Sequence, residues 1–382
     1  MNILYSLDNY DHDTGGAGLA ARALAQRLAA LGHHVEVLQR GGGVTRYDDG
    51  PVRVHTRPLP RSWLFRDRDL DTLRWNEAWR PMLEDYLSRH CPDLVLTQNR
   101  LLVSTVDVSR ARNIPVVVFV HAYSMFCLEA FVSRDPLSDC DRRCSQCLPW
   151  WSRLRYGWVQ RNLDEYERAI RAAQLVVANS RYMQDVIRRF YGLEAEVVYP
   201  TADLEPCGGD AALRQSVLFV KPQQVKGLPI FLEIARRMPG TRFLVAGSPS
   251  WRGGLRLRCR PNVERLGWVA DMQSVYARSR VVLGPSIWPE PFGRVFVEAG
   301  ACGVPAVASR RGGIPEAVGE GGILIDDVFD VSRWVGALRQ LDDPAAFAAC
   351  SARAREHARR FAPDTVMRQF TEAVRRTLGI AL

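Results

Sequence analysis

Lysine is almost absent from this sequence. Only two of its 51 lysine and arginine residues are lysines, Lys221 and Lys226, and both lie in the segment Phe219–Leu228. Codon usage in a GC-rich gene favours arginine over lysine almost everywhere. The arginines therefore carry little information about function, and the two lysines stand out. A lysine offers a compact point charge on a flexible stem, which suits phosphate oxygens. The pair therefore predicts an anion-binding turn, with two solvated loop lysines as the alternative.

Long apolar runs are lacking as well. No stretch reaches the ~18 residues needed to span a bilayer, and the chain opens on a strand pattern without the charged and then apolar segments of a secretory signal. We therefore expect a cytoplasmic protein, with peripheral contact at the inner face of the membrane as a further option. The net charge of +9 indicates acidic partners such as a nucleotide or a membrane surface. The arginines are spread out without a DNA- or RNA-binding motif, so we expect no nucleic-acid partner. Nothing in the sequence indicates an oligomeric state.

Short apolar segments alternate with helical patterns along the whole chain. Such a βα order predicts an α/β protein with parallel sheets that carry helices on both faces. The segment Pro200–Gln215, rich in Pro, Gly, Ala and Asp, reads as a linker between two domains. The predicted strands are Asn2–Ser6, Val35–Leu38, Val52–His55, Leu94–Thr97, Ile114–Val120, Leu175–Ala178, Val197–Tyr199, Val217–Val220 and Val281–Leu283; the predicted helices include Leu19–Leu31, ended by Gly32, one that Ser180 would cap, and Pro363–Leu378.

The two lysines follow the strand Val217–Val220 and precede a helix from about Leu228 to Met238. Backbone N–H groups at the start of a helix have no partner within the helix and carry partial positive charge, so they favour anions. Two ammonium groups would complete a cradle for a diphosphate.

A second group of polar residues places two carboxylates, Glu290 and Glu298, on either side of a helix start. A Pro-rich loop carries the first, and a helix that begins near Phe292 or Gly293 carries the second. Carboxylates accept hydrogen bonds from hydroxyls, while the N–H groups of Phe292, Gly293, Arg294 and Val295 would hold phosphate oxygens. The pattern predicts a site for a sugar, a diphosphate and a ribose. The structural alternatives are a loop cap for Glu290 and a helix-dipole partner for Glu298.

The lysine pair, the two glutamates and the later Gly312-Gly-Ile-Pro-Glu316, in this order and spacing, resemble the C-terminal domain of GT-B glycosyltransferases of family 4, the large retaining class. The resemblance covers essentially the whole chain. Met1–Ser6 is similar to the first strand of the family, Asp13–Leu19 to its glycine-rich loop, His121 to its active-site histidine and Gly267-Trp-Val269 to the segment beside the nucleobase. Two positions depart from the pattern: Lys221 stands where arginine is usual, and Ala122 where aspartate often follows the histidine.

The resemblance implies a GT-B fold of two Rossmann-like domains whose parallel sheets face a central cleft. Residues 1–200, with a crossover helix at about 363–382, would bind the acceptor, and residues 201–362 the nucleotide sugar. The implied reaction is the retaining transfer of a sugar from a UDP- or GDP-linked donor to a hydroxyl of a glycan, a lipid-linked or a small-molecule acceptor, with no cofactor required.

The resemblance also implies roles for individual residues. Glu290, His121 and Lys226 would act in catalysis: Glu290 and His121 at the donor sugar, and Lys226 with Lys221 at the diphosphate. Glu298 would hold the ribose hydroxyls. Gly16, Val269 and the helix start at Phe292, Gly293, Arg294 and Val295 would contact the donor.

The loop after the first strand is acidic and glycine-rich: it carries Asp8, Asp11, His12 and Asp13 ahead of Gly15, and Asp11, Asp13 and Gly15 are the candidate acceptor-binding residues. Its carboxylates would select a cationic acceptor such as an amino sugar. Solvated loop carboxylates are the alternative. A protein of another class, a non-catalytic sensor of sugar nucleotides or a partner subunit on the same fold, also fits the composition, but the intact lysines and glutamates argue against it.

Four of the nine cysteines, Cys127, Cys140, Cys144 and Cys147, fall within 21 residues just beyond His121. Their spacing is close to that of structural zinc sites without matching a standard one, and the surrounding residues are polar. A structural zinc ion, a disulfide or redox pairing, and ordinary cysteines without a joint role all remain open. A four-thiolate site would be structural, because it leaves no open position for a substrate.

Overall fold

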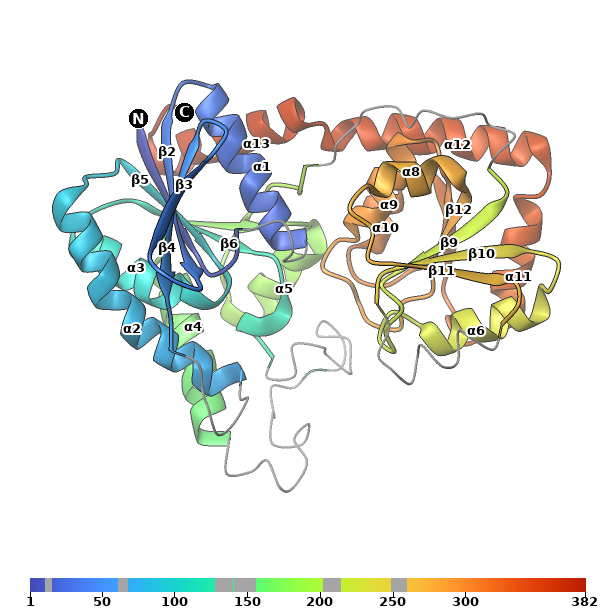
Figure 1. The fold of residues 1–382 in the computed structure, drawn as a ribbon, viewed down its shortest axis with the longest axis horizontal. Helices are drawn as coiled ribbons and strands as arrows, with labels where there is room; N and C mark the ends of the chain where they lie inside the picture. The colour runs from blue at the N-terminus through green and yellow to red at the C-terminus, as the bar shows by residue number, and fades with distance from the viewer. Residues whose placement is uncertain (11–15, 61–67, 128–139, 141–155, 202–213, 249–259) are drawn as a thin grey trace. The chain divides into compact units, whose positions relative to one another are not determined.

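The computed structural model describes residues 1–10, 16–60, 68–127, 140, 156–201, 214–248 and 260–382 (Figure 1). The chain forms two compact units. The first consists of Met1–Thr201 together with Asp364–Leu382, and the second of Ala202–Pro363. That the first domain binds the acceptor and the second the nucleotide sugar stays a prediction.

The first unit is built on an eight-stranded sheet with the order β3-β4-β2-β1-β5-β6-β7-β8. Its strands are β1 (Asn2–Leu7), β2 (His34–Gly41), β3 (Thr45–Asp49), β4 (Val52–Pro58), β5 (Leu94–Gln98), β6 (Val116–Val120), β7 (Leu175–Ala178) and β8 (Glu196–Val197). Neighbouring strands are parallel except for β3 and β4, which form an antiparallel hairpin. The strand β3 is not among the predicted strands. The overlooked signal was Asp49-Gly50, a hairpin dipeptide whose glycine has a φ of 59°.

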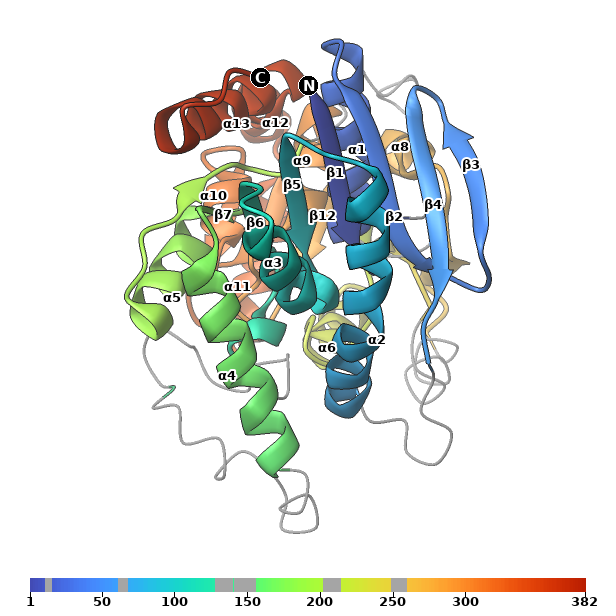
Figure 2. The ribbon, with the colours of Figure 1, turned by 90° about the vertical axis from the view of Figure 1, so that its left-hand side faces the viewer.

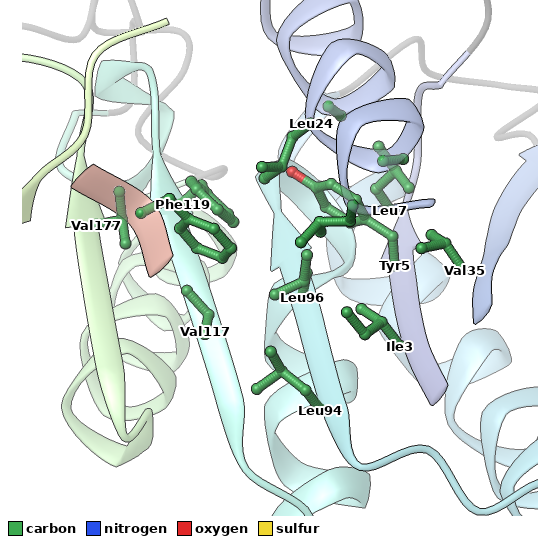
Figure 3. Packing of buried hydrophobic residues seen from close by; sticks show 14 of the residues in the cluster. Ile3, Tyr5, Leu7, Leu24, Val35, Leu94, Leu96, Val117, Phe119 and Val177 are labelled. Carbon is green, nitrogen blue, oxygen red and sulfur yellow. The ribbon is translucent and has the colours of Figure 1, made fainter. Parts of the chain in front are cut away.

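Alternate residues of β1 face opposite sides of this sheet. Ile3, Tyr5 and Leu7 join a buried cluster with residues of α1 (Gly16–Ala30) and α13 (Pro363–Leu378), as Figure 3 shows for the strand side chains and Leu24. On the other face Trp79 donates from its indole nitrogen to the Ser6 hydroxyl, 3.0 Å away. This period of two is the one expected of a strand covered on both faces.

Helices α2 (Arg68–Arg89), α3 (Leu102–Ala111) and α4 (Tyr156–Ala172) lie together on the second face (Figure 2). The short helix η2 (Asn99–Leu101) leads into α3, η3 (Tyr123–Met125) follows β6, and α5 (Arg181–Tyr191) follows β7. Ser180 caps α5 by accepting from the N–H of Met183, which confirms the predicted N-cap. The last helix, α13, has the predicted bounds, and its Phe370 packs against Phe119 of β6 at 5.7 Å between ring centroids.

The second unit contains a six-stranded, fully parallel sheet with the order β11-β10-β9-β12-β13-β14. The strands are β9 (Ser216–Val220), β10 (Arg242–Ala246), β11 (Val263–Gly267), β12 (Ser279–Gly284), β13 (Ala306–Ser309) and β14 (Gly322–Ile325). Its helices are α6 (Leu228–Arg237), α8 (Met272–Arg278), α9 (Arg294–Ala301), α10 (Ile314–Val318), α11 (Val331–Gln340) and α12 (Pro344–Ala358), followed by η7 (Arg359–Phe361). Both units are thus parallel-sheet α/β structures, which confirms the predicted fold class.

Candidate functional site

Three loops of the second unit meet beyond the carboxyl ends of β9, β12 and β13. The backbone N–H groups of Ile287 and Trp288 donate to the Val225 carbonyl at 3.1 and 3.2 Å. The Pro-rich loop that carries Ile287 and Trp288 also carries Glu290, whose carbonyl accepts from the N–H of Gly313 at 2.7 Å. The lysine-bearing turn, the Pro-rich loop and the Gly312-Gly313 turn are therefore fixed to one another by backbone hydrogen bonds. In an open parallel sheet this is the edge where ligands bind.

Two glycines allow the loops to approach this closely. Gly227 and Gly312 have φ values of 85° and 60°, in the left-handed region that favours glycine. A Cβ atom at Gly227 would overlap the Pro285 carbonyl oxygen, and one at Gly312 would overlap the Glu290 backbone. The close contact of these loops thus depends on the absence of a side chain at both positions.

We expect Gly227→Ala to destabilise the second unit by ~2–4 kcal/mol, because the new methyl group adds a steric clash to an unfavourable φ. Thermal and urea unfolding of this variant and of a control variant will measure the change in stability. Gly336→Ala is the matched control: Gly336 lies within α11 with open space around its Cα, so alanine there should be neutral or stabilise by ~1 kcal/mol. Equal unfolding midpoints for the two variants would contradict the argument.

Lys226 contacts the first glutamate directly. Its Nζ lies 2.7 Å from Glu290 Oε2, and the two side chains are only 17% and 12% exposed. The ammonium group also lies 4.8 Å from the centroid of the Trp288 ring, within cation–π distance. The carboxylate and the aromatic ring together hold the lysine charge at the sheet edge.

Lys221 is the first residue after β9, and it has a left-handed φ of 56°, unusual for a residue with a side chain. Its N–H donates to the Ala246 carbonyl at 2.8 Å, which ties it to the end of β10. Removal of its ammonium group from water, and then the charge of Lys226, lower the pKa of Lys221. The residue still has an exposed surface, so solvent and a ligand can reach it. An anion bound beside Lys221 and Lys226 would relieve the repulsion between the two neighbouring cations.

The second glutamate is held in place by two partners. Arg294 Nε lies 2.6 Å from Glu298 Oε1, and the Tyr276 hydroxyl donates to Glu298 Oε2 at 2.8 Å. Burial, and then the nearby Glu298 carboxylate, raise the pKa of Tyr276 well above its ordinary value, so the phenol remains protonated and donates. Each carboxylate oxygen keeps lone pairs for further donors.

The helix that carries Glu298 begins without a side-chain cap. Gly293, with a φ of 103°, occupies the N-cap position of α9, and no side chain accepts from its first N–H groups. Arg294 and Val295 are the first helical residues, one or two positions later than the sequence indicated. Phe292 is buried and packs edge-on against Phe361 at 5.3 Å between centroids. The Phe292 side chain therefore belongs to the core of the second unit and is not exposed to a ligand.

His121 follows β6 directly in the first unit. Its ring stacks on that of Phe119 with centroids 5.8 Å apart and planes 4° from parallel. Desolvation lowers the pKa of His121 to about 4, so the imidazole is neutral at physiological pH. A neutral ring donates and accepts hydrogen bonds but brings no charge to a ligand.

A histidine that is neutral when folded makes stability depend on pH. The folded pKa lies below the unfolded value of ~6.5, so the contribution is complete above pH ~6.5 and is lost as the pH falls toward 4. The wild-type protein should therefore lose unfolding free energy as the pH falls through this window. His121→Gln removes the titrating ring, so we expect the variant to lose less, by at most ~3 kcal/mol. Urea unfolding at pH 7 and pH 4.5 measures it, and an unchanged pH dependence would refute a neutral His121.

Several other predicted site residues lie at the edge of the described chain or outside it. Gly16 is the first residue of α1, with Ala17 bonded through its carbonyl to the Gln98 side chain at 3.1 Å. Val269, two residues beyond β11, is partly buried. Asp11, Asp13 and Gly15 fall outside the described residues, and their predicted contact with an acceptor stays a prediction.

The predicted zinc site is only partly described. Cys127 and Cys140 are not in a disulfide, and neither are Cys91 and Cys350, whereas Cys302 is. Cys144 and Cys147 lie outside the described residues. Among the described side chains no three of the His, Cys, Asp and Glu type come together to hold a metal ion. The zinc site therefore stays a prediction.

Sequence reasoning missed three contacts of this site. The Arg294–Glu298 pair was visible as an i, i+4 spacing on a helix. Trp288 lies two residues before Glu290 in the same Pro-rich loop. Its position against Lys226 depends on how this loop packs on the lysine-bearing turn, which the sequence does not indicate. Tyr276 had no local signal, because α8 meets α9 only in the folded unit.

Two family profiles match the chain. The profile of Glycosyltransferase Family 4 matches residues 14–206, about half of the chain, and that of Glycosyl transferases group 1 matches residues 214–343. D-inositol 3-phosphate glycosyltransferase of Mycolicibacterium smegmatis is 35% identical over 236 residues, which cover 54% of this chain and 52% of the relative. The chain spans about half the length of the first such relatives. A relative of the same name from Corynebacterium urealyticum is 27% identical over 95% of this chain and 91% of its own.

Solved structures share the fold at low sequence identity. A sucrose-phosphate synthase from Thermosynechococcus elongatus matches with a TM-score of 0.75 and 19% identity, over 99% of this chain and all of the other. HepE of Anabaena, solved in complex with UDP-glucose, matches with a TM-score of 0.70 and 21% identity, over 98% of this chain and all of its own. None of the helices in the described part of the chain is long and apolar enough to cross a membrane.

Proposed function

The chain belongs to glycosyltransferase family 4 of the GT-B fold, and from this premise we propose that it transfers a sugar from a UDP-sugar to a hydroxyl of a small phosphorylated acceptor, with retention at the anomeric carbon. The observation that carries the proposal is the group of charges at the edge of the second sheet. Lys221, Lys226 and Glu290 lie on loops that hydrogen bonds hold together, and the Arg294–Glu298 pair opens the adjacent helix.

This arrangement suits a nucleoside diphosphate sugar. As the bond to the donor sugar breaks, negative charge develops on the diphosphate, and stabilisation of that charge lowers the barrier. Lys221 and Lys226 supply two positive charges. The uncapped N–H groups at the start of α9 supply donors at a positive helix end. We assign Glu298 to the ribose hydroxyls, because Arg294 and Tyr276 fix its oxygens while leaving lone pairs.

In the absence of a donor, Glu290 neutralises Lys226. Arrival of a diphosphate gives the ammonium group a second anionic partner and frees one side of the carboxylate, which then accepts a hydroxyl of the donor sugar. Glu290 acts here as a positioning group and not as a nucleophile. We assign the neutral His121 to the same sugar from its place after β6, where it resembles the histidine of the family. Same-face attack by the acceptor hydroxyl, with the donor phosphate taking its proton, would give retention.

The UDP donor and the phosphorylated acceptor are proposed from the related proteins. HepE was solved with UDP-glucose, and the curated relatives are named for inositol 3-phosphate. A small panel of UDP-, GDP- and ADP-sugars will test the donor: we expect a UDP-sugar to raise the melting temperature most. The alternative of a non-catalytic sugar-nucleotide-binding protein predicts the same shift without any transfer product.

Transfer should persist in excess chelator, and the product linkage should have the anomeric configuration of the donor. The physical reason is that lysines and helix N–H groups provide the charge stabilisation at the diphosphate. The anomeric proton coupling in the NMR spectrum of the product gives the stereochemistry, with an untreated reaction as the control for the chelator. An inverted product would remove the retaining mechanism, whereas loss of transfer on chelation alone would not, because a chelator also removes zinc from the predicted structural cysteine site.

A further inference from the structure

Two arginines and an aspartate come together at the carboxyl edge of the first sheet, the edge at which His121 follows β6. Asp8 follows β1, Arg40 lies near the end of β2, and Arg100 lies in η2 after β5. The parallel register pairs Leu7 with Gln39 and Ser6 with Thr97, so the strands β2, β1 and β5 end side by side. The topology therefore brings these three residues to one edge.

A buried tryptophan supports both guanidinium groups. The guanidinium carbons of Arg100 and Arg40 lie 3.8 and 4.6 Å from the centroid of the Trp75 ring. Trp75 is 4% exposed and donates from its indole nitrogen to the Pro60 carbonyl at 2.7 Å, which fixes the ring. Arg100 Nε also donates to the Thr72 hydroxyl at 2.8 Å. Stacking on a fixed ring restricts the guanidinium groups before any ligand arrives, so less side-chain entropy is lost on binding.

The hydrogen-bonding capacity of this cluster is not used up. In the described part of the chain, Asp8 Oδ1 and Arg40 Nε are buried atoms without a hydrogen-bond partner. A buried polar atom without a partner costs free energy unless a ligand or water satisfies it. Desolvation raises the pKa of Asp8, and the charges of Arg100 and Arg40 oppose that rise, so two cations face one carboxyl group and the cluster favours an anion.

We propose that Asp8, Arg40 and Arg100 form the subsite that binds the phosphate-bearing end of the acceptor. The two guanidinium groups hold a phosphate monoester through charge-assisted hydrogen bonds. Asp8 Oδ1 accepts a hydrogen bond from a hydroxyl of the same molecule. The ligand class is therefore a polyol that carries a phosphate monoester. The assignment of this subsite to the acceptor rests on the proposed function, whereas the binding of an anion does not depend on the transfer reaction. It also argues against the cationic acceptor that the acidic loop suggested.

The test uses the full chain with saturating UDP, which occupies the donor site and leaves phosphate binding to this cluster. The probes are D-inositol 3-phosphate, neutral inositol and inorganic phosphate, and isothermal titration calorimetry gives each dissociation constant. We expect D-inositol 3-phosphate to bind more tightly than the other two. Arg40→Ala and Arg100→Ala should each weaken it at least about tenfold, and Asp8→Asn should weaken it less.

Matched variants keep the result interpretable. Arg110→Ala removes one exposed guanidinium group of the same unit, which donates to the Ala172 carbonyl, and should leave the dissociation constant unchanged. Arg40→Lys and Arg100→Lys retain charge and should bind with intermediate affinity, which covers the case in which an alanine variant does not fold. UDP affinity and the melting temperature of each variant report on the donor site and on folding.

The outcomes separate this inference from the proposed function. Binding of UDP without binding of D-inositol 3-phosphate, or a change of less than twofold in both arginine variants, would overturn the subsite while the donor site stands. Inorganic phosphate that binds as tightly as D-inositol 3-phosphate would overturn the acceptor assignment. Failure to bind UDP in the wild-type chain would count against the proposed function instead.

Discussion

Replacement of Lys226 by alanine should lower the turnover number about a hundredfold. The lysine charge lies at the sheet edge between Glu290, 2.7 Å from its Nζ, and the face of Trp288. Its loss would remove ~3 kcal/mol of stabilisation from a transition state in which the diphosphate gains negative charge. Steady-state kinetics with a UDP-sugar will measure the effect, and the melting temperature will show whether the variant remains folded.

Two further variants sharpen this result. Lys226→Arg keeps the positive charge but not the compact ammonium group, so we expect partial activity. Arg237→Ala breaks an exposed ion pair with Glu233, 2.9 Å apart, and should leave turnover unchanged because surface pairs contribute little. Near-normal turnover in Lys226→Ala would refute the assignment of the diphosphate to this lysine.

Glu298→Gln should weaken donor binding by about tenfold to a hundredfold with little change in turnover. A hydrogen bond from a ribose hydroxyl to a carboxylate contributes ~1.5–3 kcal/mol, and this contact is the same in the ground state and the transition state. Tyr276→Phe removes only the hydroxyl that positions Glu298, at 2.8 Å, so its effect on donor binding should be smaller and in the same direction. Calorimetric titration with UDP measures both.

The two glutamates should differ in the parameter that they change. Glu290→Gln is expected mainly to lower turnover, because Glu290 faces Lys226 and the donor sugar in the proposed site. Glu298→Gln is expected mainly to raise the KM for the donor. Small and equal effects for both variants would contradict the assignment of Glu290 to the donor sugar and of Glu298 to the ribose.

The order of strands and helices could be read from the sequence because it depends on local pattern. Val217–Val220 and Leu175–Ala178 are apolar runs between turn residues, and both are strands in the structure. Ser180 marks a helix start because its hydroxyl satisfies an N–H group three residues away, an interaction within a few residues of chain. The hairpin of β3 was missed because its strand is largely exposed and polar, so no apolar alternation marks it.

The candidate donor site was visible for a different reason. The lysines and glutamates were recognised by residue type and spacing, since lysine is rare in this chain and the two glutamates flank a helix start. The sequence by itself determined which residues carry charge and on which turns they lie. It also determined the family, because the motifs occur in the order and spacing of family 4.

Only the tertiary structure decided which of these groups touch. Lys226 and Glu290 belong to loops after different strands, and their contact depends on the parallel order of β9 and β12 and on a glycine at position 227. Arg40, Trp75 and Arg100 come from β2, α2 and η2, and no spacing along the chain links them. Hydrogen-bond geometry and burial depend on distances between elements that are remote in sequence, so the neutral state of His121 and the unsatisfied oxygen of Asp8 emerged only once the strands were placed side by side.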